Sequence, residues 1–115
     1  MIWYKYLYTD ESISHKKEKI KWKIRHNAGM IDMYVITLPN KDNALLEIIS
    51  TIELMQKHYP KKDMFVVGIA KGYETATQLA CEIVMEVYNN TGAFLVREYL
   101  QQRQHMQDGQ VNGCP

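Results

Sequence analysis

Cysteine is scarce and long apolar runs are missing from this 115-residue chain, and each absence excludes a class of protein. The two cysteines, Cys81 and Cys114, are too few for a disulfide framework and lack the histidine spacing of a zinc site. The apolar runs are far shorter than the roughly 20 residues that cross a bilayer, and the first residues lack the pattern of a secretory signal. We therefore expect a cytoplasmic protein without a membrane segment, a metal or a cofactor.

Catalytic motifs are missing as well. The four histidines are dispersed along the chain, and no serine lies in a GxSxG motif. The segment GIAKG at 68–72 matches neither the GxGxxG pattern nor the GxxxxGK[ST] pattern of a phosphate-binding loop. No set of nucleophile, base and stabilising group can be assembled from these residues. The sequence therefore favours a binding protein over an enzyme.

What the sequence does contain is the pattern of one α/β domain over residues 1–100. Residues 64–70 form a nearly unbroken apolar run rich in β-branched side chains, which is typical of an inner parallel strand. Apolar residues then recur at helical spacing over 73–90, a helix in which we expect Cys81 to be buried. The turn between the two elements is so short that Gly72 is expected to have a positive φ.

A second strand and helix precede this pair. Residues 31–38 predict a strand, and residues 43–59 predict a helix with an apolar stripe, capped by Asn40 or Asp42. Strand, helix and strand with short links predict that 31–38 and 64–70 lie parallel and are joined by a right-handed crossover. The predicted fold class is therefore a small α/β sheet with a parallel βαβ core.

The two ends of the chain are less regular. Residues 2–8 predict an edge strand, because a lysine lies at their centre. Residues 12–27 predict a helix, although KIKWKIR also alternates as a hairpin strand would. Residues 94–100 fit either a short strand or a helix. The polar, glutamine-rich residues 101–115 predict a disordered tail.

Several segments together resemble a known family. The basic run that ends in KIRHNAG, followed by YVITLP, LLEIIS, VVGIAKGYETATQLACEIVMEVY and TGAF, is similar to a family of small bacterial proteins, mostly from Gram-positive anaerobes. The resemblance covers nearly the whole chain up to Leu100. It implies one compact α/β domain and no catalytic residue, because no activity is established for that family.

The first candidate site lies at the strand ends. Ligands of open α/β sheets bind beyond the carboxyl ends of parallel strands. That rule selects residues at the ends of the two predicted strands 31–38 and 64–70, namely Thr37 and Asn40 for the first and Lys71, Gly72 and Tyr73 for the second. A helix N-terminus beside the positive charge of Lys71 would favour a small anionic ligand.

The second candidate site is a basic segment. The net charge of +1 hides an uneven distribution, with +5 over residues 15–26 and −4 over the remaining chain. On a helix, one aromatic ring would share a face with cations, and the predicted surface comprises Lys19, Trp22, Lys23, Arg25 and His26. Such a surface binds nucleic acid or anchors a protein interface. In the alternative, the basic residues pack near the protein's own acidic helices and Trp22 packs under the N-terminal strand.

Surplus apolar residues predict self-association. Leu46, Leu54 and the row Tyr4, Tyr6 and Tyr8 exceed what one small core needs, so we expect a homodimer. The predicted function is that of a non-catalytic, self-associating interaction module. The alternative is a protein that binds a small anion or nucleic acid through the strand ends or the basic segment.

Overall fold

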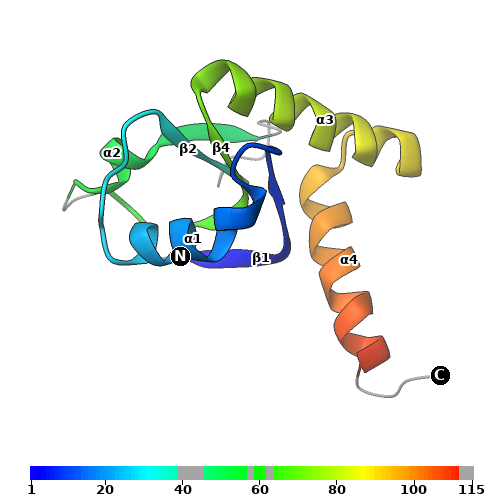
Figure 1. The fold of residues 1–115 in the computed structure, drawn as a ribbon. Coiled ribbons are helices and arrows are strands. Elements are labelled where there is room, and N and C mark those ends of the chain that lie inside the picture. The colour runs from blue at the N-terminus through cyan, green and yellow to red at the C-terminus, as the bar shows by residue number, and fades with distance from the viewer. Residues whose placement is uncertain (39–45, 57–58, 62–63, 112–115) are drawn as a thin grey trace.

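The computed structural model of the chain describes residues 1–38, 46–56, 59–61 and 64–111. It has nine elements: β1 (Ile2–Thr9), the 3-10 helix η1 (Ser14–Lys16), α1 (Lys17–Arg25), β2 (Met33–Leu38), β3 (Glu47–Ser50), α2 (Thr51–Leu54), β4 (Phe65–Lys71), α3 (Tyr73–Thr91) and α4 (Val96–Val111). The strands form one sheet with helices on both faces (Figure 1). The predicted α/β class is confirmed.

The four strands are arranged in the order β1-β4-β2-β3, and only β2 runs opposite to its neighbours. Strand β1 lies at one edge, as predicted, and pairs in parallel with β4. Strand β4 is buried along nearly its whole length, which its unbroken apolar run predicts.

The predicted parallel βαβ core is wrong, because β2 pairs with β4 in an antiparallel register. The predicted helix over 43–59 is wrong as well, since the chain forms β3 and then the four-residue helix α2 there. Ile48 and Ile49 pack on opposite faces of the sheet, as strand residues do, and the Ser50 hydroxyl accepts a hydrogen bond from the Ile52 backbone N–H (3.1 Å). Ser50 therefore caps a new helix in the middle of the predicted one. Residues 43–45 and 57–58 lie outside the described residues.

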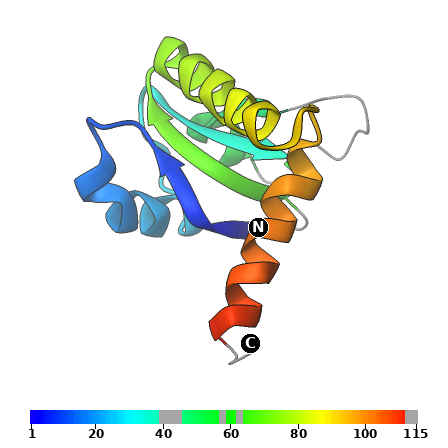
Figure 2. The ribbon, with the colours of Figure 1, turned by 90° about the vertical axis from the view of Figure 1, so that its right-hand side faces the viewer.

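Each face of the sheet has its own core, so the domain has three layers (Figure 2). One face packs against α3 and the start of α4, and the other packs against α1 and α2. The first core includes Tyr4, Ile36, Phe65, Val67, Leu79, Ile83, Val87, Val96 and Leu100, and the second includes Leu7, Ile13, Ile20, Ile24, Val35, Ile49, Leu54, Val66 and Ile69. Among the residues from which we expect a homodimer, Tyr4 and Leu54 are buried in these cores, and Tyr6, Tyr8 and Leu46 are partly buried against the first core.

Helices α1 and α3 confirm their predictions, with adjusted ends. The basic segment is helical over η1 and α1, which decides against the hairpin alternative, and α1 buries Ile20 and Ile24. Helix α3 begins after Gly72, whose φ is +91° as expected, and ends before Gly92 in the left-handed conformation. Cys81 is exposed, so the prediction that it is buried is wrong.

The C-terminal segment is helical as α4, which decides the open choice over 94–100 in favour of a helix. Residues 101–111 belong to α4, whereas the sequence predicts a disordered tail from residue 101. One reason lies in β1, whose pairing with β4 is interrupted between Trp3 and Tyr8. The backbone N–H of Lys5 in this interval donates instead to the Gln104 side chain of α4 (2.7 Å). Within the described ranges, none of the helices combines the length and apolar character that a membrane span requires.

Candidate functional site

The predicted strand-end site is not assembled, because β2 and β4 run in opposite directions. Thr37 pairs with Val66 near the start of β4, at the far end of that strand from Lys71 and Gly72. Thr37 is also buried, and Asn40 lies outside the described residues. The five predicted ligand-binding residues therefore do not form one site.

Lys71, Gly72 and Tyr73 form a structural turn. The Gly72 N–H donates to the carbonyl oxygen of Asp32 (2.6 Å), which holds the turn against the start of β2. The Tyr73 ring meets the Tyr34 ring edge-on, with centroids 5.6 Å apart. The Lys71 N–H donates to the Asp10 carboxylate (2.8 Å). The backbone N–H of Lys71 therefore already binds a carboxylate, whose negative charge opposes the predicted binding of an anion there.

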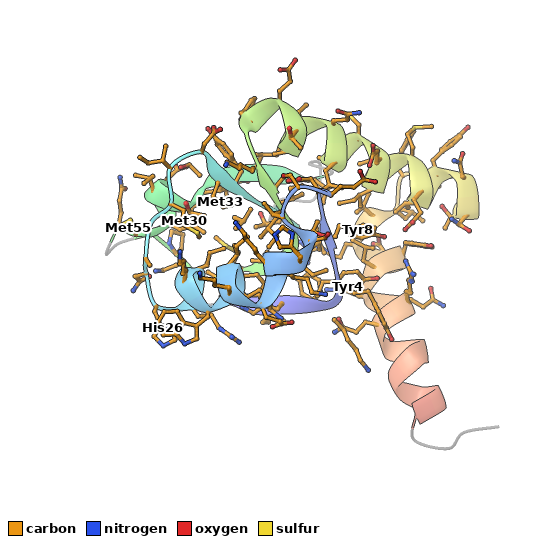
Figure 3. The ribbon with its side chains drawn as sticks, in the orientation of Figure 1. Tyr4, Tyr8, His26, Met30, Met33 and Met55 are labelled. Carbon is orange, nitrogen blue, oxygen red and sulfur yellow. The ribbon has the colours of Figure 1, made fainter. Side chains whose placement is uncertain are left out.

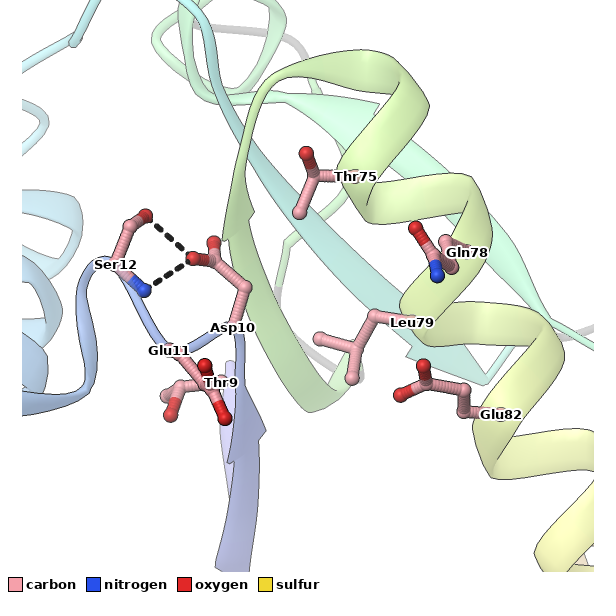
Figure 4. A pocket seen from close by; sticks show the side chains of 8 residues that line it. All are labelled: Thr9, Asp10, Glu11, Ser12, Thr75, Gln78, Leu79 and Glu82. Carbon is pink, nitrogen blue, oxygen red and sulfur yellow. Dashed lines mark hydrogen bonds between the residues drawn. The ribbon is translucent and has the colours of Figure 1, made fainter.

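A cavity of about 400 Å³ lies beyond the carboxyl ends of the parallel strands β1 and β4 (Figure 4). The helix after β1 packs on one face of the sheet and the helix after β4 packs on the other. The cavity therefore lies at a topological switch point, where ligands of such sheets bind. The cavity is lined by residues at the end of β1, in the loop that follows it and in α3: Thr9, Asp10, Glu11, Ser12, Thr75, Gln78, Leu79 and Glu82. The sequence does not predict this cavity, because it depends on pairing β4 with β1.

The charges of this cavity do not suit an anion. Three of its lining residues are acidic, and none of the described lining residues is basic. The two oxygens of Asp10 accept hydrogen bonds from Ser12 and from the Lys71 N–H. Partial burial opposes ionisation, yet these hydrogen bonds hold the pKa of the Asp10 carboxyl below its ordinary value. In the described part of the chain, no three His, Cys, Asp or Glu side chains are grouped as a metal site requires.

A polar cluster joins β1, α3 and α4. The Tyr8 hydroxyl donates to the Glu86 carboxylate, and Arg103 of α4 pairs with the same carboxylate at 3.3 Å. Burial, followed by the hydrogen bond to Glu86, raises the pKa of Tyr8 far above its usual range, so its hydroxyl stays a donor. Tyr4 lies beside Tyr8 on the side of β1 that faces α4 (Figure 3). This cluster therefore stabilises the packing of α4 against β1 and α3.

The predicted basic surface is assembled on the outer face of α1. Trp22 lies opposite the buried Ile20 and Ile24 and is 54% exposed, so it does not pack under the N-terminal strand. Lys19 and Arg25 are also exposed, and Lys23 is partly buried along its length. Lys19, Arg25 and His26 therefore share the exposed side of α1 with Trp22 at helical spacing, and Lys23 lies at the flank of this face.

His26 completes this face by stacking on Trp22. The two ring centroids are 4.0 Å apart and the ring planes differ by 23°. The Nδ1 atom of His26 lies 2.8 Å from the Trp22 carbonyl oxygen. Since a carbonyl oxygen only accepts hydrogen bonds, Nδ1 is the donor and carries the hydrogen. The imidazole lies on the outer side of α1, away from the sheet (Figure 3).

The positive charge of α1 is not balanced by the acidic helix of the same molecule. Helix α3 carries three glutamates and neither lysine nor arginine, but it covers the opposite face of the sheet. Glu18 pairs with Lys21 (3.7 Å), whose ammonium group also lies over the Trp3 ring. No ion pair joins Lys19, Lys23 or Arg25 to another residue that the structure describes. For Lys19, Lys23 and Arg25, the described residues therefore give no ion pair that would support the alternative that the basic residues pack near the protein's own acidic helices.

Comparisons with protein-family models, with curated proteins and with solved structures gave no match for this chain. The resemblance to the family of small bacterial proteins stays a prediction.

Proposed function

We propose that the protein is a non-catalytic, cytoplasmic binding module whose outer α1 face binds nucleic acid. The observation that carries the proposal is the exposed Trp22 ring at the centre of a cationic helix face that lies on the opposite side of the sheet from the acidic helix α3. Three cations of this face form no ion pair with a described residue, so they are available to phosphate groups. Because phosphate neutralisation releases counterions, this arrangement favours a polyanion over a small anion.

Salt dependence tests the proposal. Labelled 20-nucleotide DNA and RNA, single-stranded and double-stranded, would be titrated with the protein at several salt concentrations and followed by fluorescence anisotropy. If about five phosphates are neutralised, the slope of log affinity against log salt should be roughly −4. Absence of binding to every one of these probes at low salt would contradict the proposal.

A pair of charge-matched variants locates the binding face. The double variant Lys19→Ala/Arg25→Ala removes the two most exposed cations of α1, and each lost phosphate contact should reduce the slope by about one. The control variant Lys71→Ala/Arg97→Ala removes the same charge away from α1. Equal weakening by both variants would show a general effect of net charge and would reject α1 as the site.

Self-association is the second candidate function, and a different surface supports it. Met85 and Tyr88 lie on the side of α3 opposite its buried residues, and the Phe94 ring stacks on Tyr88 with centroids 4.8 Å apart. These three side chains are 42% to 50% exposed, and the adjoining Leu95 is 55% exposed. Contiguous exposed apolar side chains mark interaction surfaces, and a second copy of this chain is the partner we propose.

Light scattering tests this second candidate. A dimer should report about twice the 13.5 kDa chain mass at tens of micromolar. Met85→Glu should shift the mass toward one chain, because it places a charge on the apolar surface. Ile31→Glu is the matched control, since Ile31 is 89% exposed and lies on another part of the domain. A wild-type mass of one chain would contradict self-association.

A further inference from the structure

The ring pair Trp22–His26 is the most unusual feature of the α1 face. Each ring covers one face of the other ring, so the outward face of each ring is not covered by its partner in the stack. An exposed indole ring is unfavourable in water, because burial of apolar surface lowers the free energy. The core does not need this side chain, since Ile20 and Ile24 already fill the inner face of α1.

The pair is also held in place before any ligand arrives. His26 follows the last turn of α1, where its backbone N–H donates to the carbonyl oxygens of Trp22 and Lys23. The hydrogen bond from Nδ1 to the Trp22 carbonyl oxygen then fixes the imidazole over the indole. A ligand that stacks on this pair therefore loses little side-chain entropy on binding.

Duplex and single-stranded nucleic acids differ in what they offer to such a stack. In a duplex the bases are stacked on one another and present only their edges in the grooves. In a single strand the faces of the bases are accessible, and aromatic side chains stack on them while cations track the backbone. Lys19 and Arg25 are exposed and lie three residues before and three residues after Trp22 on α1, where they can contact phosphates of the same strand.

We propose that the Trp22–His26 pair stacks on an unpaired base, so that the α1 face selects single-stranded over double-stranded nucleic acid. This inference rests on the nucleic-acid binding proposed above and names the form of nucleic acid that is bound. The cations supply affinity for both forms, whereas the ring pair acts only on the single strand. Duplex recognition by insertion of α1 into the major groove is the competing outcome.

Tryptophan fluorescence gives a direct measurement of the stacking. The chain has two tryptophans, and Trp3 has its indole nitrogen buried on the inner side of the domain. Oligo(dT) or oligo(rU) should quench the emission of Trp22 in a Trp3→Phe background. Should Trp3→Phe destabilise the fold, the difference in quenching between the wild type and Trp22→Phe reports the same contact.

Affinity measurements with matched variants complete the test. Trp22→Ala should weaken binding to single strands on the order of 10- to 100-fold, as expected for one lost base stack, and should leave duplex binding nearly unchanged. Trp22→Phe should retain part of the preference for single strands, because phenylalanine still offers a π-face. His26→Ala should weaken single-strand binding less than Trp22→Ala does. Ile31→Ala is the control for removing an exposed apolar side chain elsewhere.

The outcomes separate this inference from the proposed function. Single-strand preference that disappears in Trp22→Ala, together with quenching, supports both. Equal affinity for single strands and duplexes without quenching would overturn the stacking inference and leave nucleic-acid binding by α1 in place. Absence of binding to all probes would overturn both.

Discussion

Helices α1 and α3 cover opposite faces of the same sheet, and their residues are used in different ways. The 19-residue helix α3 buries Ala76, Leu79, Ile83 and Val87 along one side, so its apolar pattern is largely accounted for by the core. The nine-residue helix α1 buries only Ile20 and Ile24. Its four lysines, its arginine and Trp22 make up most of its length and take little part in the core.

The comparison indicates which residues of each helix are explained by packing in the core. On α3, packing explains the inner side and leaves the outer side around Met85 and Tyr88 unexplained. On α1, packing explains two residues, and the remaining face needs another reason for its composition. We infer that α3 mainly stabilises the domain and that α1 mainly presents a surface. The predictions below test this division, from the largest expected effect to the smallest.

The largest effect is expected on the inner side of α3. Ile83→Ala removes a side chain that is 1% exposed, and such a cavity should lower the free energy of unfolding by about 2–5 kcal/mol. Met85→Ala, on the outer side of the same helix, should change it by less than about 0.5 kcal/mol. Urea unfolding followed by circular dichroism measures both. Similar losses in the two variants would show that the outer side of α3 is also part of the fold.

A smaller effect is expected at the turn that leads into α3. Gly72 has φ +91° and ψ 137°, a conformation that is costly for any other residue, so Gly72→Val should lower the free energy of unfolding by about 1–3 kcal/mol. Gly92→Asn is the control, because Gly92 adopts the left-handed conformation that asparagine tolerates and has no atom within 4 Å of an added Cβ. An unchanged thermal melt of Gly72→Val would contradict this account of the turn.

The success of sequence prediction follows the strength of local signals. Strand β4 and helix α3 have long, consistent patterns that are strengthened by Gly72 and Gly92, and they were predicted nearly to their ends. Residues 47–54 carry apolar side chains that suit either a helix or a strand followed by a short helix. Pairing with β2 decides that choice, and such pairing depends on residues outside the segment itself. Without the predicted helix between these two strands, the prediction that β2 and β4 are parallel fails as well, and they are antiparallel.

The candidate sites show the same division. The α1 face follows from helical spacing alone, so the sequence brings Trp22 and its neighbouring cations together. The stacking of His26 on Trp22 occurs at the residue that follows α1, and the spacing does not determine where this helix ends. The cavity beside Asp10 depends on which strands are parallel. The sequence pattern favours a parallel pair of β2 and β4, and such a pair does not lead to this cavity.

Asp10 links the two regions, because its carboxylate binds Ser12 in the loop toward α1 and the Lys71 N–H before α3. Its lowered pKa means that the ionised form is favoured in the folded state. The resulting stability is present above the unfolded pKa of about 3.9 and is lost as the pH falls through the lower folded pKa. Asp10→Asn should therefore lose less stability than the wild type when acidified below about pH 4.

Thermal melts between about pH 2 and pH 7 measure this difference. At neutral pH, Asp10→Asn should cost on the order of 1 kcal/mol, because one acceptor of the Lys71 N–H is weakened. Glu11→Gln is the control, since the exposed Glu11 is the next residue. Parallel acid profiles for Asp10→Asn and the wild type would show that Asp10 does not link the two regions electrostatically.

The smallest effect is expected on the outer face of α1, where the comparison is tested most directly. Lys19→Ala/Lys23→Ala/Arg25→Ala should change the free energy of unfolding by less than about 0.5 kcal/mol, since no described residue forms an ion pair with these side chains. Loss of the repulsion between Lys19 and Lys23, which are four residues apart, and the high helix propensity of alanine should offset part of any loss. Ile20→Ala on the inner face is the control and should cost about 2–5 kcal/mol. A loss above about 1 kcal/mol in the triple variant would mean that the basic face contributes to folding, and its charge would then be explained without a nucleic-acid partner.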